Sequence, residues 1–155
     1  MIPIRLSRQD DVPALFAVWL TAVRSTHDFL TGEDIDFYAG LVRDRYLPTA
    51  QLLVAVGGDD TPVGFMGMTG QKIDTLFVDP ALHGKGIGRA LVARALENGP
   101  VLTVDVNEQN RAARAFYRRL GFREVGRSAL DDSGRPFPLL HLAFDGSGQN
   151  DRTGA

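Results

Sequence analysis

Three alternating glycines, in the run Gly84-Lys85-Gly86-Ile87-Gly88, lie where a predicted strand is followed by a predicted helix. Residues without a Cβ let an anion approach the backbone closely, and the free N–H groups at a helix start point toward it. Lys85 and Arg89 add positive charge nearby. The segment therefore favours a phosphate-bearing ligand, although a glycine-rich turn that packs a helix on a sheet would have the same composition.

Two common phosphate loops do not fit this glycine spacing. The P-loop requires G-x-x-x-x-G-K-S/T, and no such run occurs in the chain. The dinucleotide fingerprint requires G-x-G-x-x-G, but the sixth position is Arg89 when counted from Gly84 and Leu91 when counted from Gly86. Asp105 follows about 20 residues later, where a ribose-binding acid is expected. The failed glycine spacing nevertheless argues against a nucleotide-binding oxidoreductase.

A tyrosine beyond the glycine loop has the chemistry of a general acid. A helix predicted at 109–120 has an apolar face of Ala113, Phe116, Tyr117 and Leu120. A phenol with an ordinary pKa of about 10 is protonated at neutral pH and can act as a proton donor. Tyr117 on this face is equally compatible with a core residue whose hydroxyl is satisfied. Asn110 precedes the helix and is a favoured N-cap.

Together the two segments resemble the GNAT (Gcn5-related N-acetyltransferase) superfamily. Residues 83–88 follow its pattern Q/R-x-x-G-x-G/A, with His83 in place of the first Gln or Arg. The later segment follows its pattern N-x-x-A-x-x-(F/L/Y)-Y-x-x-x-G-F at Asn110, Ala113, Phe116, Tyr117, Gly121 and Phe122. Thr26–Leu30, Leu76–Pro80 and Val106–Asn110 are similar to the YjaB-like bacterial acetyltransferases. The resemblance extends over roughly residues 52–144.

The resemblance implies an acyl-CoA-dependent N-acetyltransferase. Such an enzyme transfers the acetyl group of acetyl-CoA to a primary amine by direct attack and releases CoA; the acceptor is a small molecule, a protein lysine or a protein N-terminus. In the family, the pantetheine arm pairs with the strand before the glycine loop, here through Leu76 and Val78, and the pyrophosphate lies on the N–H groups of 84–89. The implied cofactor-binding residues are Leu76, Phe77, Val78, His83, Gly84, Lys85, Gly86, Ile87, Gly88, Arg89, Asn110, Ala113, Phe116 and Tyr117.

Catalysis would need a general acid and a general base. The resemblance gives Tyr117 the role of general acid toward the CoA thiolate. His27 lies between the first two predicted helices and has an ordinary pKa suited to a base at neutral pH. The other candidate bases, acting directly or through a water, are Asp28, Asp74 and Asp105.

A polar strand face offers a third catalytic candidate. Asn107 shares this face with Thr103 and Asp105, because side chains alternate along a strand. We interpret the face as part of the site; the alternative is that it lines the solvent side of the sheet. The predicted catalytic set is therefore Tyr117, His27 and Asn107, and the alternative function is a non-catalytic acyl-CoA-binding sensor or regulatory domain.

Length and composition limit the other kinds of protein that this chain could be. The 155 residues fit one domain, predicted at 1–145, with a polar tail at 146–155 expected to be disordered. The net charge of −2 gives no general attraction for nucleic acid, the absence of cysteine excludes thiolate metal sites, and no metal site is predicted. The start of the sequence has no signal-peptide pattern, and no apolar run is long enough to cross a membrane. A cytoplasmic enzyme is expected; whether it is a monomer or a homodimer stays open.

The predicted fold is α/β: the GNAT fold, with a mixed, largely antiparallel central sheet of about seven strands flanked by about four helices. A capping box of Ser7 and Asp10 is expected to start the first helix, which runs to about Arg24. The segments 25–46 and 128–137 are expected to set the choice of acceptor. Their acidic residues suit a cationic amine, although solubility explains exposed acids equally well. The predicted strands are 2–6, 51–56, 62–69, 72–78, 101–107, 122–128 and 139–144, and the later helices are 33–46, 86–97 and 109–120.

Overall fold

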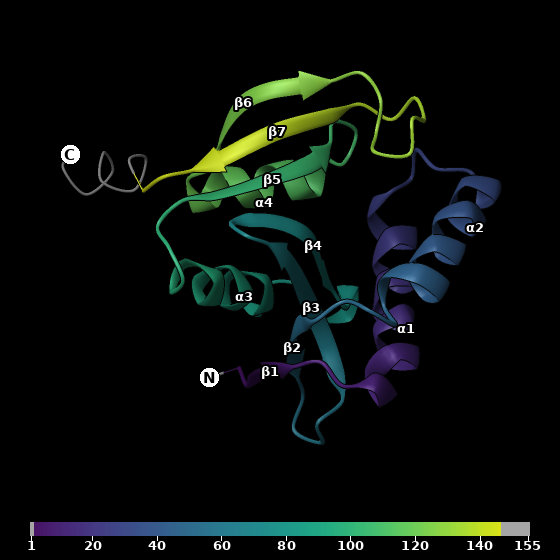
Figure 1. Cartoon of the computed structure of the whole chain (residues 1–155), viewed down its shortest axis with the longest axis vertical. Helices are drawn as coiled ribbons and strands as arrows, with labels where there is room; N and C mark the ends of the chain where they lie inside the picture. Colours follow the sequence, from purple (N-terminus) through teal and green to yellow (C-terminus); the bar gives the residue numbers. More distant parts are fainter. Residues whose placement is uncertain (1, 147–155) are drawn as a thin grey trace. The chain divides into compact units, whose positions relative to one another are not determined.

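The computed structural model describes residues 2–146, which form two compact units (Figure 1). The first unit comprises the chain up to Met68 together with Thr75–Val92, and the second comprises Thr69–Asp74 and the chain from Ala93 onward. Each unit is described by itself. The prediction of one domain over 1–145 stays a prediction, and the tail predicted at 146–155 lies outside the described residues except for Gly146.

The strands form a seven-stranded sheet in the order β1-β2-β3-β4-β5-β7-β6. The pairs β1–β2, β2–β3, β5–β7 and β6–β7 are antiparallel, whereas β4–β5 is parallel. The strands are β1 Ile4–Leu6, β2 Leu52–Val56, β3 Pro62–Thr69, β4 Lys72–Val78, β5 Leu102–Asn107, β6 Arg123–Ser128 and β7 Leu139–Phe144. The α-helices are α1 Val12–Thr26, α2 Gly32–Leu41, α3 Ile87–Leu96 and α4 Arg111–Leu120. The predicted α/β class, with a mixed and largely antiparallel sheet, is confirmed.

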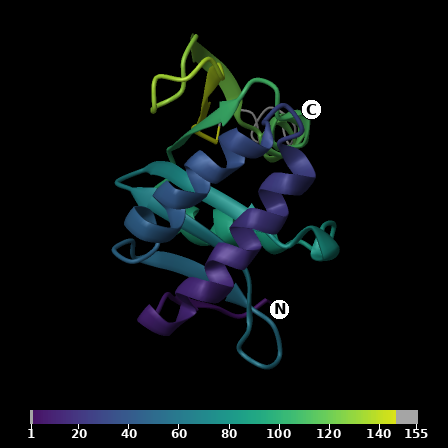
Figure 2. The same cartoon turned by 90° about the vertical axis from the view of Figure 1, so that its right-hand side faces the viewer.

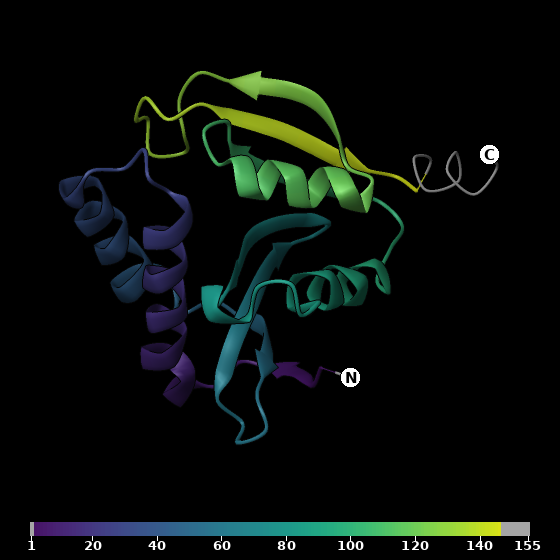
Figure 3. The same ribbon diagram turned by 180° about the vertical axis from the view of Figure 1, so that it is seen from behind.

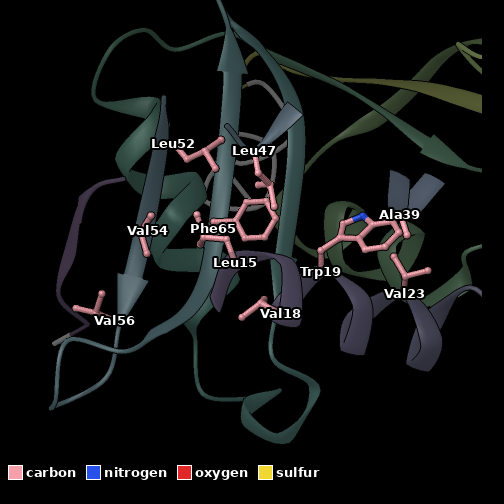
Figure 4. Packing of buried hydrophobic residues seen from close by; sticks show 10 residues of the cluster. All are labelled: Leu15, Val18, Trp19, Val23, Ala39, Leu47, Leu52, Val54, Val56 and Phe65. Atoms are coloured by element: carbon pink, nitrogen blue, oxygen red, sulfur yellow. The ribbon is translucent and has the colours of Figure 1, made fainter. Parts of the chain in front are cut away.

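The core of the first unit lies between α1 and the strands β2 and β3 (Figure 4). Leu15 and Trp19 lie one helical turn apart on α1 and are 1% and 5% exposed, so this stripe of α1 faces inward. Phe65 of β3 is fully buried, and its ring centroid lies 5.7 Å from that of Phe77 on β4. Phe77 also packs edge-on against Trp19. These aromatic contacts fix β4 directly before the glycine loop.

The start of α1 differs from the prediction: a 3₁₀ turn at Gln9–Asp11 precedes the helix, which begins at Val12. The Ser7–Asp10 capping box is wrong: the carboxylate of Asp11 accepts the hydrogen bond from the Arg8 N–H, at 2.7 Å. The physical reason is that the Ser7 hydroxyl already accepts a hydrogen bond from the N–H of Leu52 in β2, at 3.0 Å. The helix also ends at Thr26 rather than at about residue 24.

The helix predicted at 33–46 has two parts in the structure. It begins as α2, which lies beside α1 (Figure 2), and continues as a π-helical turn, η2, at Val42–Tyr46. A capping box that the sequence did not predict starts α2: the hydroxyl of Thr31 accepts from the Asp34 N–H, and the Asp34 carboxylate accepts from the Thr31 N–H. The π-helical turn brings the Tyr46 hydroxyl within 2.8 Å of the Thr75 hydroxyl on β4.

In the second unit, α4 packs on one face of β5, β7 and β6 (Figure 3). The ring centroid of Tyr117 on α4 lies 5.1 Å from that of Phe122, which in turn lies 5.4 Å from that of Phe144 on β7. Asn110 caps α4, because its side-chain oxygen accepts a hydrogen bond from the Ala113 N–H at 3.1 Å. This confirms the capping role predicted for Asn110. None of the helices in residues 2–146 is long and apolar enough to cross a membrane.

Candidate active site

Two glycines of the loop have backbone conformations that other residues rarely adopt. The φ angles of Gly84 and Gly86 are +81° and +83°, a region in which side chains are strained. A Cβ at either position would meet no heavy atom within 4 Å. Conformation rather than crowding therefore requires glycine here, and the space beside the loop is open to a ligand.

The start of α3 presents unpaired backbone donors beside this space. The first helical hydrogen bond runs from the Ala90 N–H to the Gly86 carbonyl, at 2.9 Å. The N–H groups of residues 87–89 therefore have no acceptor within the helix. Ile87 is 6% exposed and anchors the turn, whereas Lys85 and Arg89 are exposed. Backbone donors, the positive end of the helix dipole and two cations together suit a pyrophosphate.

The part of β4 that leads to the loop has little pairing with β5. The parallel register covers Lys72 with Thr103 and Ile73 with Val104, and no later residue of β4 pairs with β5 within the described chain. The half-buried Leu76 and Val78 lie in this unpaired stretch, so their backbone groups suit pairing with an extended ligand. Because the ring of Phe77 packs in the core, a ligand contact at this residue would involve its backbone.

Tyr117 combines a buried ring with a hydroxyl that has no hydrogen-bond partner among the described residues. The residue is 4% exposed, and its ring lies between those of Phe116 and Phe122, with both centroid distances 5.1 Å. Burial raises the pKa of the Tyr117 hydroxyl well above its ordinary value. An ordinary phenol is already protonated at neutral pH, and the raised pKa makes Tyr117 a weaker proton donor.

His27 is held in one tautomer at the end of α1. The Thr26 hydroxyl donates to the Ala22 carbonyl at 2.8 Å and lies 2.8 Å from Nδ1 of His27. Since the single proton of that hydroxyl goes to the carbonyl, Nδ1 must be the donor and Nε2 carries the free lone pair. Burial lowers the pKa of His27 to about 4, although Asp28 opposes this effect. His27 is therefore neutral at pH 7, but it is a weak base.

The polar face predicted on β5 is present. Thr103, Asp105 and Asn107 are exposed or half-buried, whereas the residues between them are buried. Asp105 has two partners from neighbouring strands that the sequence did not predict: Nδ1 of His141 at 2.6 Å and Nζ of Lys72 at 3.0 Å. Partial burial raises the pKa of the Asp105 carboxyl group, but the hydrogen bonds from His141 and Lys72 outweigh it and bring this pKa below its usual value.

The structure groups the predicted site residues into two sets. The glycine loop, residues 76–78 and His27 belong to the first unit, and Asn107, Asn110, Ala113, Phe116 and Tyr117 belong to the second. Of the other candidate bases, Asp28 is exposed and Asp74 accepts a hydrogen bond from the Thr69 hydroxyl. The side chain of His83 is exposed, and the backbone N–H of this residue donates to the Pro80 carbonyl at 3.2 Å.

Comparison with known proteins identifies the class to which this fold and loop belong. A family model described as acetyltransferase (GNAT) domain matches residues 39–138. Peptidyl-lysine N-acetyltransferase YjaB of Escherichia coli is 49% identical over 147 residues, which cover 95% of this chain and 99% of the relative. Peptidyl-lysine N-acetyltransferase YiaC of the same organism is 31% identical over 134 residues, or 86% of this chain and 91% of the relative.

Solved structures agree with this class. The solution structure of apo YjaB from E. coli has a TM-score of 0.88 at 49% identity and covers 93% of this chain and 97% of its own. The PaiA N-acetyltransferase of Thermoplasma acidophilum, solved with coenzyme A, has a TM-score of 0.75 at 20% identity and covers 94% of this chain and 99% of its own. The second likeness shows the shared fold.

These matches define the class: the α/β protein with a glycine-rich loop before α3 is an acyl-transferring enzyme. The chain belongs to the GNAT acetyltransferase family. Three predictions are confirmed at the level of the family: the resemblance to the YjaB-like members, the N-acetyltransferase activity, and acetyl-CoA as the cosubstrate.

Proposed function

We propose that this chain acetylates lysine side chains of proteins, with acetyl-CoA as the acetyl donor and CoA as a product. The observation that carries the proposal is its 49% identity, over 95% of the chain, to an E. coli enzyme named a peptidyl-lysine N-acetyltransferase. The GNAT domain match supports the same chemistry and disfavours the alternative of a non-catalytic acyl-CoA sensor.

The first unit supplies the groups that would hold the donor. The N–H groups at the start of α3, with Lys85 and Arg89, suit the pyrophosphate. The backbone of Leu76 and Val78 suits the amide groups of the pantetheine arm, as an added strand would. In this proposal the open space beside Gly84 and Gly86 receives the phosphates.

Tyr117 is the proposed source of the proton for the leaving group. When the lysine amine attacks the thioester carbonyl, the carbon–sulfur bond breaks and the sulfur leaves with the electron pair. The Tyr117 hydroxyl donates its proton to this sulfur, since a phenol is protonated at neutral pH. Asn107 is proposed to orient the reacting groups from the polar face of β5.

The acidic residues of the segments 25–46 and 128–137 are of two kinds: some are exposed and could attract a cationic lysine, and others hold local structure by hydrogen bonds. Asp28, Glu33 and Asp36 are exposed in the segment 25–46 and would attract an ammonium group. Asp34 instead caps α2, and the carboxylate of Asp131 accepts hydrogen bonds from the N–H groups of residues 133 and 135. These two carboxylates have structural roles. A cytoplasmic location and the absence of nucleic-acid binding stay predictions.

The test offers three amines to the purified full chain with acetyl-CoA: a blocked peptide with one lysine, a lysine-free peptide with a free N-terminus, and spermidine. CoA release is followed with a thiol reagent, and the acetylated atom is located by mass spectrometry. We expect acetylation of the lysine Nε atom. Turnover of only the N-terminal peptide or only spermidine would reject the lysine proposal while retaining the enzyme class.

A further inference from the structure

Three residues of the first unit meet at one hydroxyl oxygen on β4. The hydroxyl oxygens of Tyr46 and Thr75 lie 2.8 Å apart, and the backbone N–H of Gly67 in β3 donates to the same Thr75 oxygen at 3.0 Å. Thr75 is therefore held from two sides, by the π-helical turn η2 and by β3. We call Tyr46, Gly67 and Thr75 the Tyr46 cluster; all three belong to the first unit.

Glycine at position 67 makes room for this cluster. A Cβ on Gly67 would overlap the hydroxyl oxygen of Tyr46 and would lie 2.8 Å from the hydroxyl oxygen of Thr75, closer than Cβ atoms approach in proteins. Gly67 does not have a positive φ, so space rather than conformation requires glycine here. Tyr46 is the last residue of η2, and short π-helical segments occur frequently at functional sites.

The Tyr46 cluster lies directly before the part of β4 that suits the pantetheine arm. Within the described chain the pairing of β4 with β5 ends at Ile73, so residues 76–78 have a strand neighbour only on the β3 side. After this stretch, the backbone N–H of Asp79 donates to the Val63 carbonyl in β3 at 2.9 Å. Residues 76–78 are therefore attached to β3 at both ends, through the hydroxyl of Thr75 at one end and through a backbone hydrogen bond at the other.

We propose that Tyr46 is a positioning residue for donor binding: through Thr75 it holds residues 76–78 in the extended conformation that pairs with the amide groups of the pantetheine arm. The inference rests on acetyl-CoA as the donor in the proposed function and is independent of the acceptor. A strand with a neighbour on one side only keeps more conformational freedom than a fully paired strand, and a ligand that orders it must offset the lost entropy. The contacts at Thr75 restrict this freedom before the donor arrives, so they favour binding.

A purely structural role of the Tyr46 hydroxyl has different consequences. The ring of Tyr46 is partly buried against the core of the first unit, and Tyr46→Phe keeps that ring. A hydroxyl that served stability alone would, on removal, lower the melting temperature and leave the Kd for acetyl-CoA unchanged. A hydroxyl that positions β4 would, on removal, raise the Kd and the KM for acetyl-CoA, whereas kcat at saturating acetyl-CoA would stay close to the wild-type value.

The test is a double-mutant cycle of Tyr46→Phe and Thr75→Val, in which calorimetry measures the Kd for acetyl-CoA without an acceptor. We expect each single variant to raise the Kd by about 3–10-fold, as the loss of one hydrogen bond would. The double variant should bind like Thr75→Val alone, because both changes break the same contact. Thr75→Ser keeps the hydroxyl and should bind like the wild type, and so should the control Tyr38→Phe, which removes a tyrosine hydroxyl from α2. An unchanged Kd in Tyr46→Phe, or effects that simply add, would overturn the proposal.

A measurement without the donor tests the physical cause. Amide hydrogen exchange at residues 76–78 should be faster in the unliganded Tyr46→Phe variant than in the wild type, and exchange in α4 of the second unit serves as the control. Equal exchange at 76–78 would contradict the restriction of β4 by Tyr46. A wild-type chain without affinity for acetyl-CoA would reject the donor of the proposed function and this inference with it, whereas a wild-type chain that binds as tightly as Tyr46→Phe would reject the positioning role alone.

Discussion

Tyr117 illustrates how one residue can satisfy two interpretations at once. Its ring is a core residue of the second unit, which was the structural interpretation of the apolar face on α4. Its hydroxyl nevertheless has no hydrogen-bond partner among the described residues, and burial raises its pKa further above the neutral range, in which a phenol is already protonated. The packed ring thus holds the hydroxyl in place, and Tyr117 is compatible with the role of a proton donor.

Replacing Tyr117 with phenylalanine separates these two roles. The ring packing is kept, so the melting temperature and the Kd for acetyl-CoA should stay close to those of the wild type. We expect kcat to fall by about 100-fold or more, since general acids contribute at least about this much. Steady-state kinetics and calorimetry check this. An unchanged kcat would remove Tyr117 from the mechanism.

His27 should make the stability of the protein depend on pH. Its folded-state pKa of about 4 lies below the ordinary value of 6.5, so the unfolded chain binds more protons between these values. The free energy of unfolding should therefore fall as the pH is lowered through this range, by up to about 3 kcal/mol from His27. Urea unfolding at pH values from 7.5 to 4 measures it. His27→Gln should flatten this slope, and an equally steep slope in the variant would contradict the assignment.

At the scale of elements, the start of α1 is held by a buried carboxylate. Asp11 is 6% exposed, and its two oxygens accept hydrogen bonds from the Arg5 guanidinium at 2.8 and 2.9 Å. The hydrogen bond from the Arg5 side chain lowers the pKa of Asp11, and the hydrogen bond from the backbone N–H of Arg8 lowers it further. Burial raises this pKa, but the hydrogen bonds outweigh it, so the pKa lies below its ordinary value. The strand β1 and the first turn before α1 are thereby joined through one side chain.

Asp10 provides a matched control for Asp11, because it is exposed and adjacent. Asp11→Asn should lower the free energy of unfolding by about 2 kcal/mol, since charged hydrogen bonds to Arg5 are lost. Asp10→Asn should change it by less than about 0.5 kcal/mol. Urea denaturation of the two variants checks both values. Equal effects would support the originally predicted box at Ser7 and Asp10.

The sequence predicted most elements, because their signals are local. The apolar stripe of α1, the Asn110 cap and the glycine loop each depend on residues a few positions apart. The contacts of Asp105 with Lys72 and His141 were not predicted, since they depend on the register of three strands separated by long segments. The π-helical turn at Val42–Tyr46 was also missed, because helical periodicity does not distinguish it from a continued α-helix.

At the scale of the whole molecule, donor binding should raise the stability of the folded chain. Any ligand that binds only the folded state stabilises it, by about 2.7 kcal/mol at a concentration of 100 times Kd. We expect acetyl-CoA, but not NAD, to raise the melting temperature measured by differential scanning fluorimetry. Both nucleotides carry a pyrophosphate, so the comparison tests the acyltransferase interpretation of the glycine loop.

A pair of glycine variants makes this experiment specific. Gly86→Val places a side chain at a φ of +83° in the loop and should abolish the shift with acetyl-CoA. Gly58→Val, in an exposed turn where a Cβ meets no atom within 4 Å, should keep it. A shift that survives in Gly86→Val would contradict the role of the loop.

The interleaving of the two units along the chain has a consequence for synthesis on the ribosome. The first unit is complete once residue 92 has emerged, but Thr69–Asp74 belongs to the second unit and must wait for later residues. On the β5 side, Lys72 and Ile73 pair with Thr103 and Val104. These partners are translated about 30 residues later, or several seconds at slow elongation rates of about 5 residues per second. During this interval β4 of the nascent chain has its neighbour β3 but lacks β5 on its other edge. Vectorial folding should proceed in two stages, and the second should begin only when β5 leaves the exit tunnel.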